Sequence, residues 1–447
     1  MTIPGSRELA AEVARLAGES RALKSDAAGP GAEEPGAYED ACTRLLHLIR
    51  TLIGMKVAWI SEFVGVEQVF RMVDTAPGER GPDVGATTPL SDAYCSRVLA
   101  GAMPAVIPNV RDDPTAVWLD LTFAMQIGSY LGVPLHGPDG APTGMLCAIS
   151  DTPTPDLDEQ DLATARLVAQ VIDDLSQRAV NEARGRRERR MLGDQLTAMC
   201  RGHGRRSVLH PIVDIRTGDA VAAEGLTRFT DNRRTPSGWF AAAHTAGLGS
   251  DLEVAAARDA LTRLDDTAAP PAIAVNVSPA VAANRIEEVL DGVDPARVVL
   301  ELTEYAPVHD YAALTEALAP SRAAGMRIAI DDVGAGFASM SHVLRLRPDL
   351  VKIDMTLVRD IDADPIRQAL AGALVRFAEA TGAAVVAEGV ETVAELTALD
   401  SLGVPLAQGY LFGTPSAHPV LRGLPHCAPS GAGAHTKGRS RPSTAVG

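Results

Sequence analysis

The second half of the chain alternates short apolar segments with helical ones, and this alternation limits the folds open to it. From Ser207, two apolar runs form a predicted hairpin that turns at 216–219, and six further apolar runs are separated by segments of helical periodicity. Near-continuous apolar strands alternating with helices are typical of a parallel sheet buried on both faces. Eight strands in about 220 residues fit a (β/α)8 barrel, a TIM-like α/β fold whose first strand is antiparallel because of the hairpin. An open, doubly wound sheet is the alternative, but no Gly-rich dinucleotide-binding fingerprint supports it.

Polar residues close almost every predicted strand of this region. In a barrel the carboxyl ends of the strands form one face, where active sites of this fold lie. Burying so many carboxylates without compensation would be unfavourable, and oxygen ligands of this kind favour Mg²⁺ or Mn²⁺ over Zn²⁺. The residues concerned are Glu224, Asn276, Glu301, Asp331, Asp332, Lys352, Asp354, Glu388 and Gln408.

The adjacent carboxylates Asp331 and Asp332 lie in the segment GMRIAIDDVGAG at 325–336. Neighbouring residues of a regular strand point to opposite faces, so both can serve one cavity only if the strand ends there and the backbone changes direction. An N-cap followed by a solvated turn is the alternative interpretation. The other strand ends favour a shared site, in which two cations about 3.5–4 Å apart would clamp the attacking and leaving oxygens of a phosphodiester displacement.

Arg228 indicates that the ligand of this site is an anion. It shares a strand face with Glu224 and Leu226, and an arginine can hold a phosphate with paired hydrogen bonds. Glu304 does not share a face with Glu301 and is expected in the following loop. The pattern predicts metal-dependent phosphodiester hydrolysis and does not identify the substrate.

Composition narrows the partners and the compartment. A formal net charge of -16 argues against a nucleic-acid duplex or an anionic membrane as partner. Five scattered cysteines without a C-x-x-C pair argue against a disulfide framework or a zinc ribbon. Without an apolar run of about 20 residues or a signal-peptide pattern, we expect no membrane insertion and a soluble, cytoplasmic protein.

The first half of the chain predicts a separate α+β domain. Residues 1–37 have the composition of a disordered segment, and 38–179 combine helices with hairpin-forming strands. A long helical stretch over 156–199 leads through a helical linker at 180–205 to the barrel at 206–424, and a disordered tail follows at 425–447. The apolar stripe of the helical stretch 156–199 favours a parallel homodimer held by a coiled coil, although Gly185 is expected to weaken a continuous coiled coil. The alternative is a core helix followed by a solvated basic segment.

The motifs EGLTR, NVSP, ELTE, DDVGAGFAS, VKID, AEGVE and QGYLFG, taken in this order across about 207–415, resemble the EAL-domain family. The resemblance implies a cyclic di-GMP phosphodiesterase that forms pGpG with two Mg²⁺ or Mn²⁺ ions per site. It implies that Lys352 positions the attacking water and is oriented by Asp354, that Glu304 braces the DDVGAG loop, and that Glu388 is a candidate general base. The implied first-metal ligands are Glu224, Asn276, Glu301 and Asp331; the second-metal ligands are Asp331, Asp332 and Glu388; and Leu226, Arg228, Glu391 and Gln408 bind substrate.

Several residues depart from the pattern of that family. Gly225 replaces the usual alanine and is expected to loosen its strand, and Val333 and Ala335 alter a loop that the family links to dimerisation and activation. His210 and Phe229 stand where glutamine and tryptophan are common. None of these changes removes an implied metal ligand. A cyclic di-GMP receptor without turnover, and a barrel acting on another phosphodiester, remain the alternatives.

The segments VAWISEF, LSDAYCSRVLAG, IGSYLGVPL and GMLCAIS resemble a GAF domain across 38–179. The resemblance implies a sensor domain that binds a small molecule, here an unknown ligand, or that dimerises. Cys95 and His136 could serve a cofactor, but a structural role is the more common one for a lone cysteine or histidine.

Overall fold

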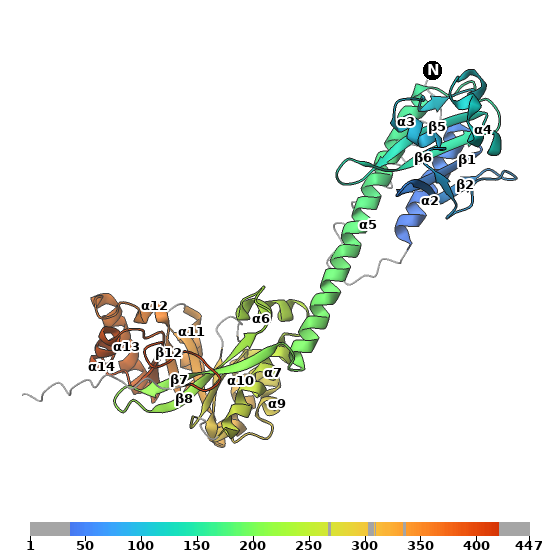
Figure 1. The fold of residues 1–447 in the computed structure, drawn as a ribbon. Helices are drawn as coiled ribbons and strands as arrows, with labels where there is room; N and C mark the ends of the chain where they lie inside the picture. The colour runs from blue at the N-terminus through green and yellow to red at the C-terminus, as the bar shows by residue number, and fades with distance from the viewer. Residues whose placement is uncertain (1–35, 267–269, 303–307, 309, 334–336, 420–447) are drawn as a thin grey trace, which may run out of the picture. The chain divides into compact units, whose positions relative to one another are not determined.

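The computed structural model describes residues 36–266, 270–302, 308, 310–333 and 337–419, with the backbone alone at 37, 332 and 337–341. The described chain divides into two compact units between Arg189 and Arg190. Each unit has its own sheet and its own hydrophobic cores, and Figure 1 labels many of their elements.

The first unit is built on a six-stranded sheet with the order β3-β2-β1-β6-β5-β4. All of its strand pairings are antiparallel, which confirms the predicted hairpin of β1 and β2. The strands are β1 (Val57–Val64), β2 (Glu67–Thr75), β3 (Thr87–Pro89), β4 (Val106–Ile107), β5 (Ser129–His136) and β6 (Pro142–Ser150).

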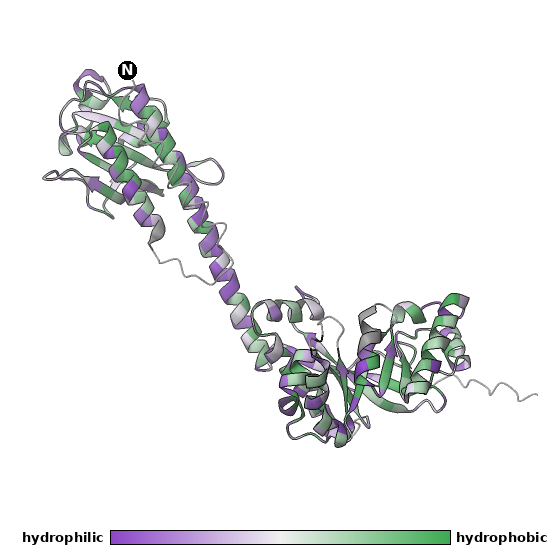
Figure 2. Cartoon of the chain, turned by 180° about the vertical axis from the view of Figure 1, so that it is seen from behind, coloured by the Kyte–Doolittle hydropathy of each residue, from purple (hydrophilic) through white to green (hydrophobic). Residues whose placement is uncertain are grey.

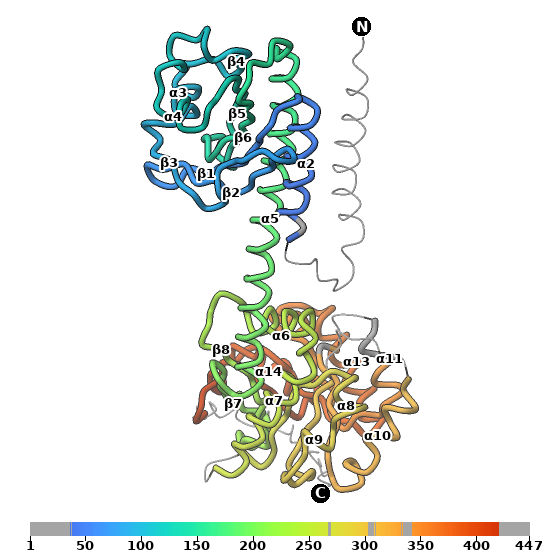
Figure 3. Tube along the Cα trace, turned by 90° about the vertical axis from the view of Figure 1, so that its right-hand side faces the viewer, coloured from blue at the N-terminus to red at the C-terminus, as the bar shows by residue number. Residues whose placement is uncertain are grey.

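Two helices cover one face of this sheet. Helix α2 (Ala37–Ile53) lies beside the first half of α5 (Glu159–Cys200), and both pack on the strands through residues such as Leu45 and Val168 (Figure 3). The other face carries α3 (Tyr94–Leu99) and α4 (Asp120–Ala124) over a second core, in which the rings of Tyr94 and Tyr130 meet edge to face at 4.8 Å. This arrangement matches the α+β domain expected from the sequence.

Helix α5 continues without a break through Gly185. The glycine does not interrupt the helix of the single chain. Whether it weakens a coiled coil between two chains stays a prediction. The stretch 181–190 is mostly exposed and hydrophilic (Figure 2), so solvent-facing charged residues surround the glycine.

The second unit is a closed barrel with the strand order β10-β11-β12-β13-β14-β7-β8-β9. Strand β7 pairs antiparallel with both neighbours and the other pairs are parallel, as the hairpin and the alternating pattern predict. The strands are β7 (Arg205–Asp214), β8 (Ala220–Phe229), β9 (Ile273–Val277), β10 (Val298–Leu302), β11 (Arg327–Val333), β12 (Leu350–Ile353), β13 (Ala384–Ala387) and β14 (Leu406–Gln408).

Helices surround the barrel (Figure 1). They are α6 (Pro236–Thr245), α7 (Gly249–Leu261), α8 (Pro279–Asn284), α9 (Ile286–Leu290), α10 (Tyr311–Ala323), α11 (Phe337–Leu346), α12 (Met355–Val358), α13 (Pro365–Thr381) and α14 (Val393–Ser401). All of them except α6 pack on the outer side chains of the barrel in one large core. Trp239 and Ala243 of α6 belong to a smaller core with the end of α5. The periodic pattern did not predict α6. Its local signals are Thr235, whose hydroxyl accepts from the Gly238 N–H, and Pro236 in the first turn.

Candidate active site at the carboxyl ends of the barrel strands

The inward-facing side chains of the barrel change from apolar to polar within two residues. A compact apolar cluster includes Ala222, Ala274, Val299, Ala329, Leu350 and Val386, with Leu406 packed against it. Alternate residues of a strand share a face, so the next inward position lies two residues further along. Those positions hold Glu224, Asn276, Glu301, Asp331, Lys352, Glu388 and Gln408. The strand period thus places the predicted site residues directly above the apolar interior.

Lys352 is the centre of this polar layer. Its side chain is 1% exposed, and its ammonium nitrogen lies 3.0 Å from Glu301 Oε2, 3.1 Å from Asp331 Oδ1 and 2.5 Å from Glu388 Oε1. A fourth carboxylate, that of Glu224, approaches to 3.8 Å. Burial alone would lower the pKa of Lys352, but the surrounding carboxylates outweigh burial and raise it well above its ordinary value. Lys352 is therefore a fixed positive charge.

Two amide side chains hold the carboxylate of Glu224. Asn276 Nδ2 donates to Glu224 Oε1 and Gln408 Nε2 donates to Glu224 Oε2, each at 2.8 Å. Burial would raise the pKa of Glu224, but Lys352 and the two amide donors outweigh it, and the pKa is lowered. Three strands thereby fix one ionised carboxylate in place.

The layer holds more acidic groups than one ammonium can neutralise. Burial raises the pKa of Glu301 well above its ordinary value, and the neighbouring carboxylates add to this effect. Burial likewise raises the pKa of Glu388 to about 8, with repulsion from Asp331 and Glu224 adding to it. Glu301 Oε1 is also buried without a hydrogen-bond partner among the described residues. At neutral pH this site therefore retains protons that an incoming cation could displace.

The donor chemistry fits hard divalent cations, because it consists of carboxylate and amide oxygens, of which Glu301 Oε1 and Gln408 Oε1 are buried without a hydrogen-bond partner among the described residues. In this structure the carboxylates converge on the Lys352 ammonium. Within the part of the chain that the structure describes, no three His, Cys, Asp or Glu side chains are arranged as a metal-binding group. The metal-ligand assignments remain predictions.

The pair Asp331–Asp332 coincides with a disturbance in the barrel. The register between β11 and β12 shifts between Ile330 and Val333, although β11 itself continues to Val333. The pairing is thus irregular at the two carboxylates as expected, but the strand does not end there. The side chain of Asp332 lies outside the described residues.

The remaining predicted residues lie at the edge of this layer or outside it. Leu226 and Arg228 follow Glu224 on β8 and are partly buried. Asp354 caps α12 by accepting from the Thr356 N–H at 2.8 Å, and the Glu391 carboxylate lies 3.6 Å from the Arg359 guanidinium. Glu304 and Ala335 lie outside the described residues, so their predicted roles stay predictions.

Gly225 corrects one expectation about the strand that carries Glu224. A Cβ atom at this position would lie 2.5 Å from the Ala260 Cβ of α7 and 3.3 Å from the Ala274 carbonyl oxygen. The glycine therefore permits a close approach of helix to strand; it does not simply loosen β8.

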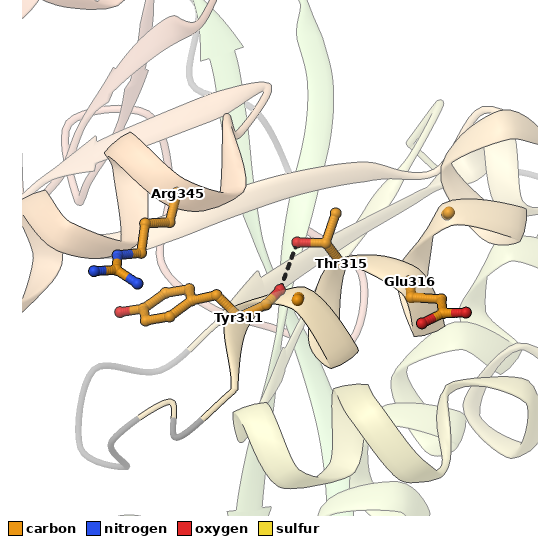
Figure 4. A pocket seen from close by; sticks show the side chains of 6 residues that line it. Tyr311, Thr315, Glu316 and Arg345 are labelled. Carbon is orange, nitrogen blue, oxygen red and sulfur yellow. Dashed lines mark hydrogen bonds between the residues drawn. The ribbon is translucent and has the colours of Figure 1, made fainter.

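A shallow pocket also lies on the outside of the barrel, between α10 and α11 (Figure 4). Tyr311, Thr315 and Glu316 of α10 and Arg345 of α11 line it, and the Arg345 guanidinium lies 4.8 Å from the centre of the Tyr311 ring. None of the predicted site residues belongs to it. This pocket is a surface feature apart from the polar layer.

Comparison with known families identifies both units. The EAL domain profile matches residues 193–415, and the GAF domain profile matches residues 37–172. In addition, none of the helices in the described part of the chain has the length and apolar character needed to cross a bilayer.

Individual relatives match about half to two thirds of this chain. An uncharacterised protein of Azorhizobium caulinodans is 34% identical over 49% of this chain and 33% of its own length. A protein of Pseudomonas aeruginosa named cyclic di-GMP phosphodiesterase is 28% identical over 64% of this chain and 51% of its own length. Among solved structures, a manganese and cyclic di-GMP complex of Klebsiella pneumoniae BlrP1 is 30% identical over 49% of this chain and 60% of that chain, with a TM-score of 0.42.

This chain spans a quarter to two fifths of the length of the first curated relatives that it matches. The two profiles nevertheless match consecutive regions, and the closed barrel and the antiparallel sheet lie in the corresponding units. The chain is an EAL-domain protein with an N-terminal GAF domain.

Proposed function

We propose that this chain hydrolyses cyclic di-GMP to pGpG in a reaction that depends on Mg²⁺ or Mn²⁺, under regulation by the GAF domain. The observation that carries the proposal is the polar layer, in which Glu224, Glu301, Asp331 and Glu388 surround the buried Lys352. The similarity to a relative named cyclic di-GMP phosphodiesterase supports the choice of substrate.

The layer would hold two cations. The first would be bound by Glu224, Asn276, Glu301 and Asp331, and the second by Asp331, Asp332 and Glu388. When bound, such cations polarise phosphoryl oxygens and lower the pKa of a coordinated water. The amide donors to Glu224 keep that carboxylate ionised and fixed, which prepares it as a ligand.

The chain's own residues supply the remaining functions. Lys352 stays charged and, oriented by Asp354, holds the attacking water beside the acidic groups. Glu388 is the candidate general base, because it is buried and lies 2.5 Å from Lys352 Nζ. Arg228 binds a phosphate of the substrate, and Leu226, Glu391 and Gln408 line its binding site. Glu304 supports the loop that follows Asp332.

The substitution Glu224→Gln tests this assignment. It keeps the size of the side chain but replaces the anchored carboxylate, so we expect turnover of cyclic di-GMP to fall at least about a hundredfold. The exposed Glu316→Gln on α10 is the matched control and is expected to keep the wild-type rate. Product formation is measured by chromatographic separation of pGpG. A Glu224→Gln variant with the wild-type rate would refute the metal assignment.

The same assay separates the proposal from the alternatives. Tight binding of cyclic di-GMP that forms no pGpG would identify the chain as a receptor. Absence of both binding and turnover would point to another phosphodiester. Calorimetric titration with cyclic di-GMP in the presence of Ca²⁺ or Mn²⁺ supplies the binding measurement.

A further inference from the structure

Gln408 links two side chains that belong to neighbouring strands. It is 2% exposed on β14, and its amide nitrogen lies 2.8 Å from Glu224 Oε2 and 2.7 Å from His210 Nδ1. His210 on β7 stands directly opposite Glu224 on β8 in the antiparallel ladder. An amide nitrogen has two hydrogens, and here each has one acceptor.

These two contacts define which way the amide group points. With the amide reversed, its oxygen would lie against Glu224 Oε2, so that two acceptor oxygens would face each other. Asn276 Nδ2 donates to the other oxygen of that carboxylate, and Lys352 Nζ lies 3.8 Å from Oε2. His210 must accept at Nδ1, so its proton lies on Nε2. Burial lowers the pKa of His210, which favours this neutral form.

The orientation has a consequence for the amide oxygen. Gln408 Oε1 is buried and has no hydrogen-bond partner among the described residues. This oxygen is left as an acceptor without a partner beside the polar layer, while the nitrogen of the same amide donates to Glu224. A change at His210 would therefore affect both ends of Gln408 at once.

We propose that His210 is a positioning residue for the cation site: by accepting one amide hydrogen of Gln408, it holds the amide in the orientation that donates to Glu224. This inference rests on the proposed cation site and adds a residue that contacts neither cation nor substrate in that proposal. In this proposal, the effect of His210 on the cation site passes through Gln408.

Titration of the full-length chain with Mn²⁺, followed by electron paramagnetic resonance of the free ion, tests the proposal without reference to turnover. We expect His210→Phe, which removes the acceptor, to weaken Mn²⁺ binding about tenfold. His210→Asn, which offers an oxygen near the former Nδ1, is expected to restore most of the affinity. His244→Phe, at an exposed histidine of α6, is the matched control and should bind Mn²⁺ as the wild type does.

A double-mutant cycle then tests the route through Gln408. In the Gln408→Leu background, His210→Phe should cause no further loss of affinity. The same loss in both backgrounds, or equal binding by wild type and His210→Phe, would overturn the role of His210. If the wild type itself binds no Mn²⁺, the cation site fails and this proposal fails with it. Circular dichroism and thermal unfolding establish that each variant is folded.

Discussion

At the scale of single residues, Gly225 shows how a departure from a family pattern can be a packing requirement. The glycine replaces the alanine of the usual tripeptide, and a Cβ there would lie only 2.5 Å from the Ala260 Cβ. Its position next to Glu224 makes the spacing between α7 and β8 part of the site's support. Alanine, the usual residue of the family at position 225, would therefore not fit the spacing that α7 and β8 have in this chain.

We accordingly expect Gly225→Ala to lower the free energy of unfolding by about 1–3 kcal/mol, because the added methyl group must displace α7. The measurement is urea unfolding of the two proteins at one temperature. Gly193→Ala in α5 is the matched control, since a Cβ there meets no atom within 4 Å, and it should be neutral or slightly stabilising. An unchanged stability of Gly225→Ala would show that α7 adjusts freely.

At the scale of elements, one buried glutamate joins the loop after β13 to the end of α12. Glu395 is 5% exposed and completes a capping box with Thr392 at the start of α14. Its oxygens accept from the N–H groups of Asp360 at 3.1 Å, Glu391 at 2.9 Å and Thr392 at 3.0 Å. The segment that carries Glu388 and Glu391 is thereby tied to its neighbour.

These contacts give a pH dependence of known sign. Burial would raise the pKa of Glu395, but the backbone donors outweigh burial and lower it below its ordinary 4.5. A lowered pKa contributes stability that is complete above the unfolded value and is lost as the pH falls through the folded value. We expect Glu395→Gln to cost about 1–2 kcal/mol at pH 7, with the difference from wild type shrinking below pH 4.5.

Chemical unfolding of both proteins between about pH 3 and pH 7 measures this difference at each pH, at equal ionic strength. The exposed Glu316→Gln of α10 serves as the control and should change the stability little at any of these values. A difference for Glu395→Gln that grows toward low pH would contradict the assigned sign.

The strand pattern predicts part of this site, and the packing of the folded barrel determines the rest. The period of the strands and their polar ends were sufficient to predict the barrel and most of the residues around Lys352. The contact of His210 with Gln408 was not predicted, because these residues come from the first and last strands and meet only when the barrel closes. The close approach at Gly225 depends on the position of α7, which local periodicity does not specify.

At the scale of the whole molecule, α5 takes part in the cores of both units. Its residues Leu196 and Met199 are buried with Trp239, Ala243 and Leu252 of the second unit. They precede the barrel boundary predicted at 206, whereas the EAL profile begins at residue 193. The fold of the second unit is therefore expected to require the last turns of this helix.

Two fragments test that requirement. We expect the fragment 181–447 to be more stable than the fragment 206–447, since burying each of Leu196 and Met199 contributes about 1.5–3 kcal/mol. Thermal unfolding compares them under one set of conditions. Equal melting temperatures would show that the barrel does not need the helix end.

The fragment 181–447 also tests the proposed regulation and the proposed homodimer. If the GAF domain regulates the barrel, its removal should change the rate of cyclic di-GMP turnover or the oligomeric state. Sedimentation velocity and the pGpG assay measure the two quantities. An unchanged rate together with an unchanged oligomeric state would show that the first unit has no regulatory effect under those conditions.

We expect the polar layer around Lys352 to act on cyclic di-GMP only when divalent cations are bound. The most direct measurement is pGpG formation by the full-length chain after removal of metals with a chelator and again after addition of Mg²⁺ or Mn²⁺. We predict no turnover in the first condition and recovered turnover in the second. Equal rates in both conditions, or no pGpG in either, would contradict the claim.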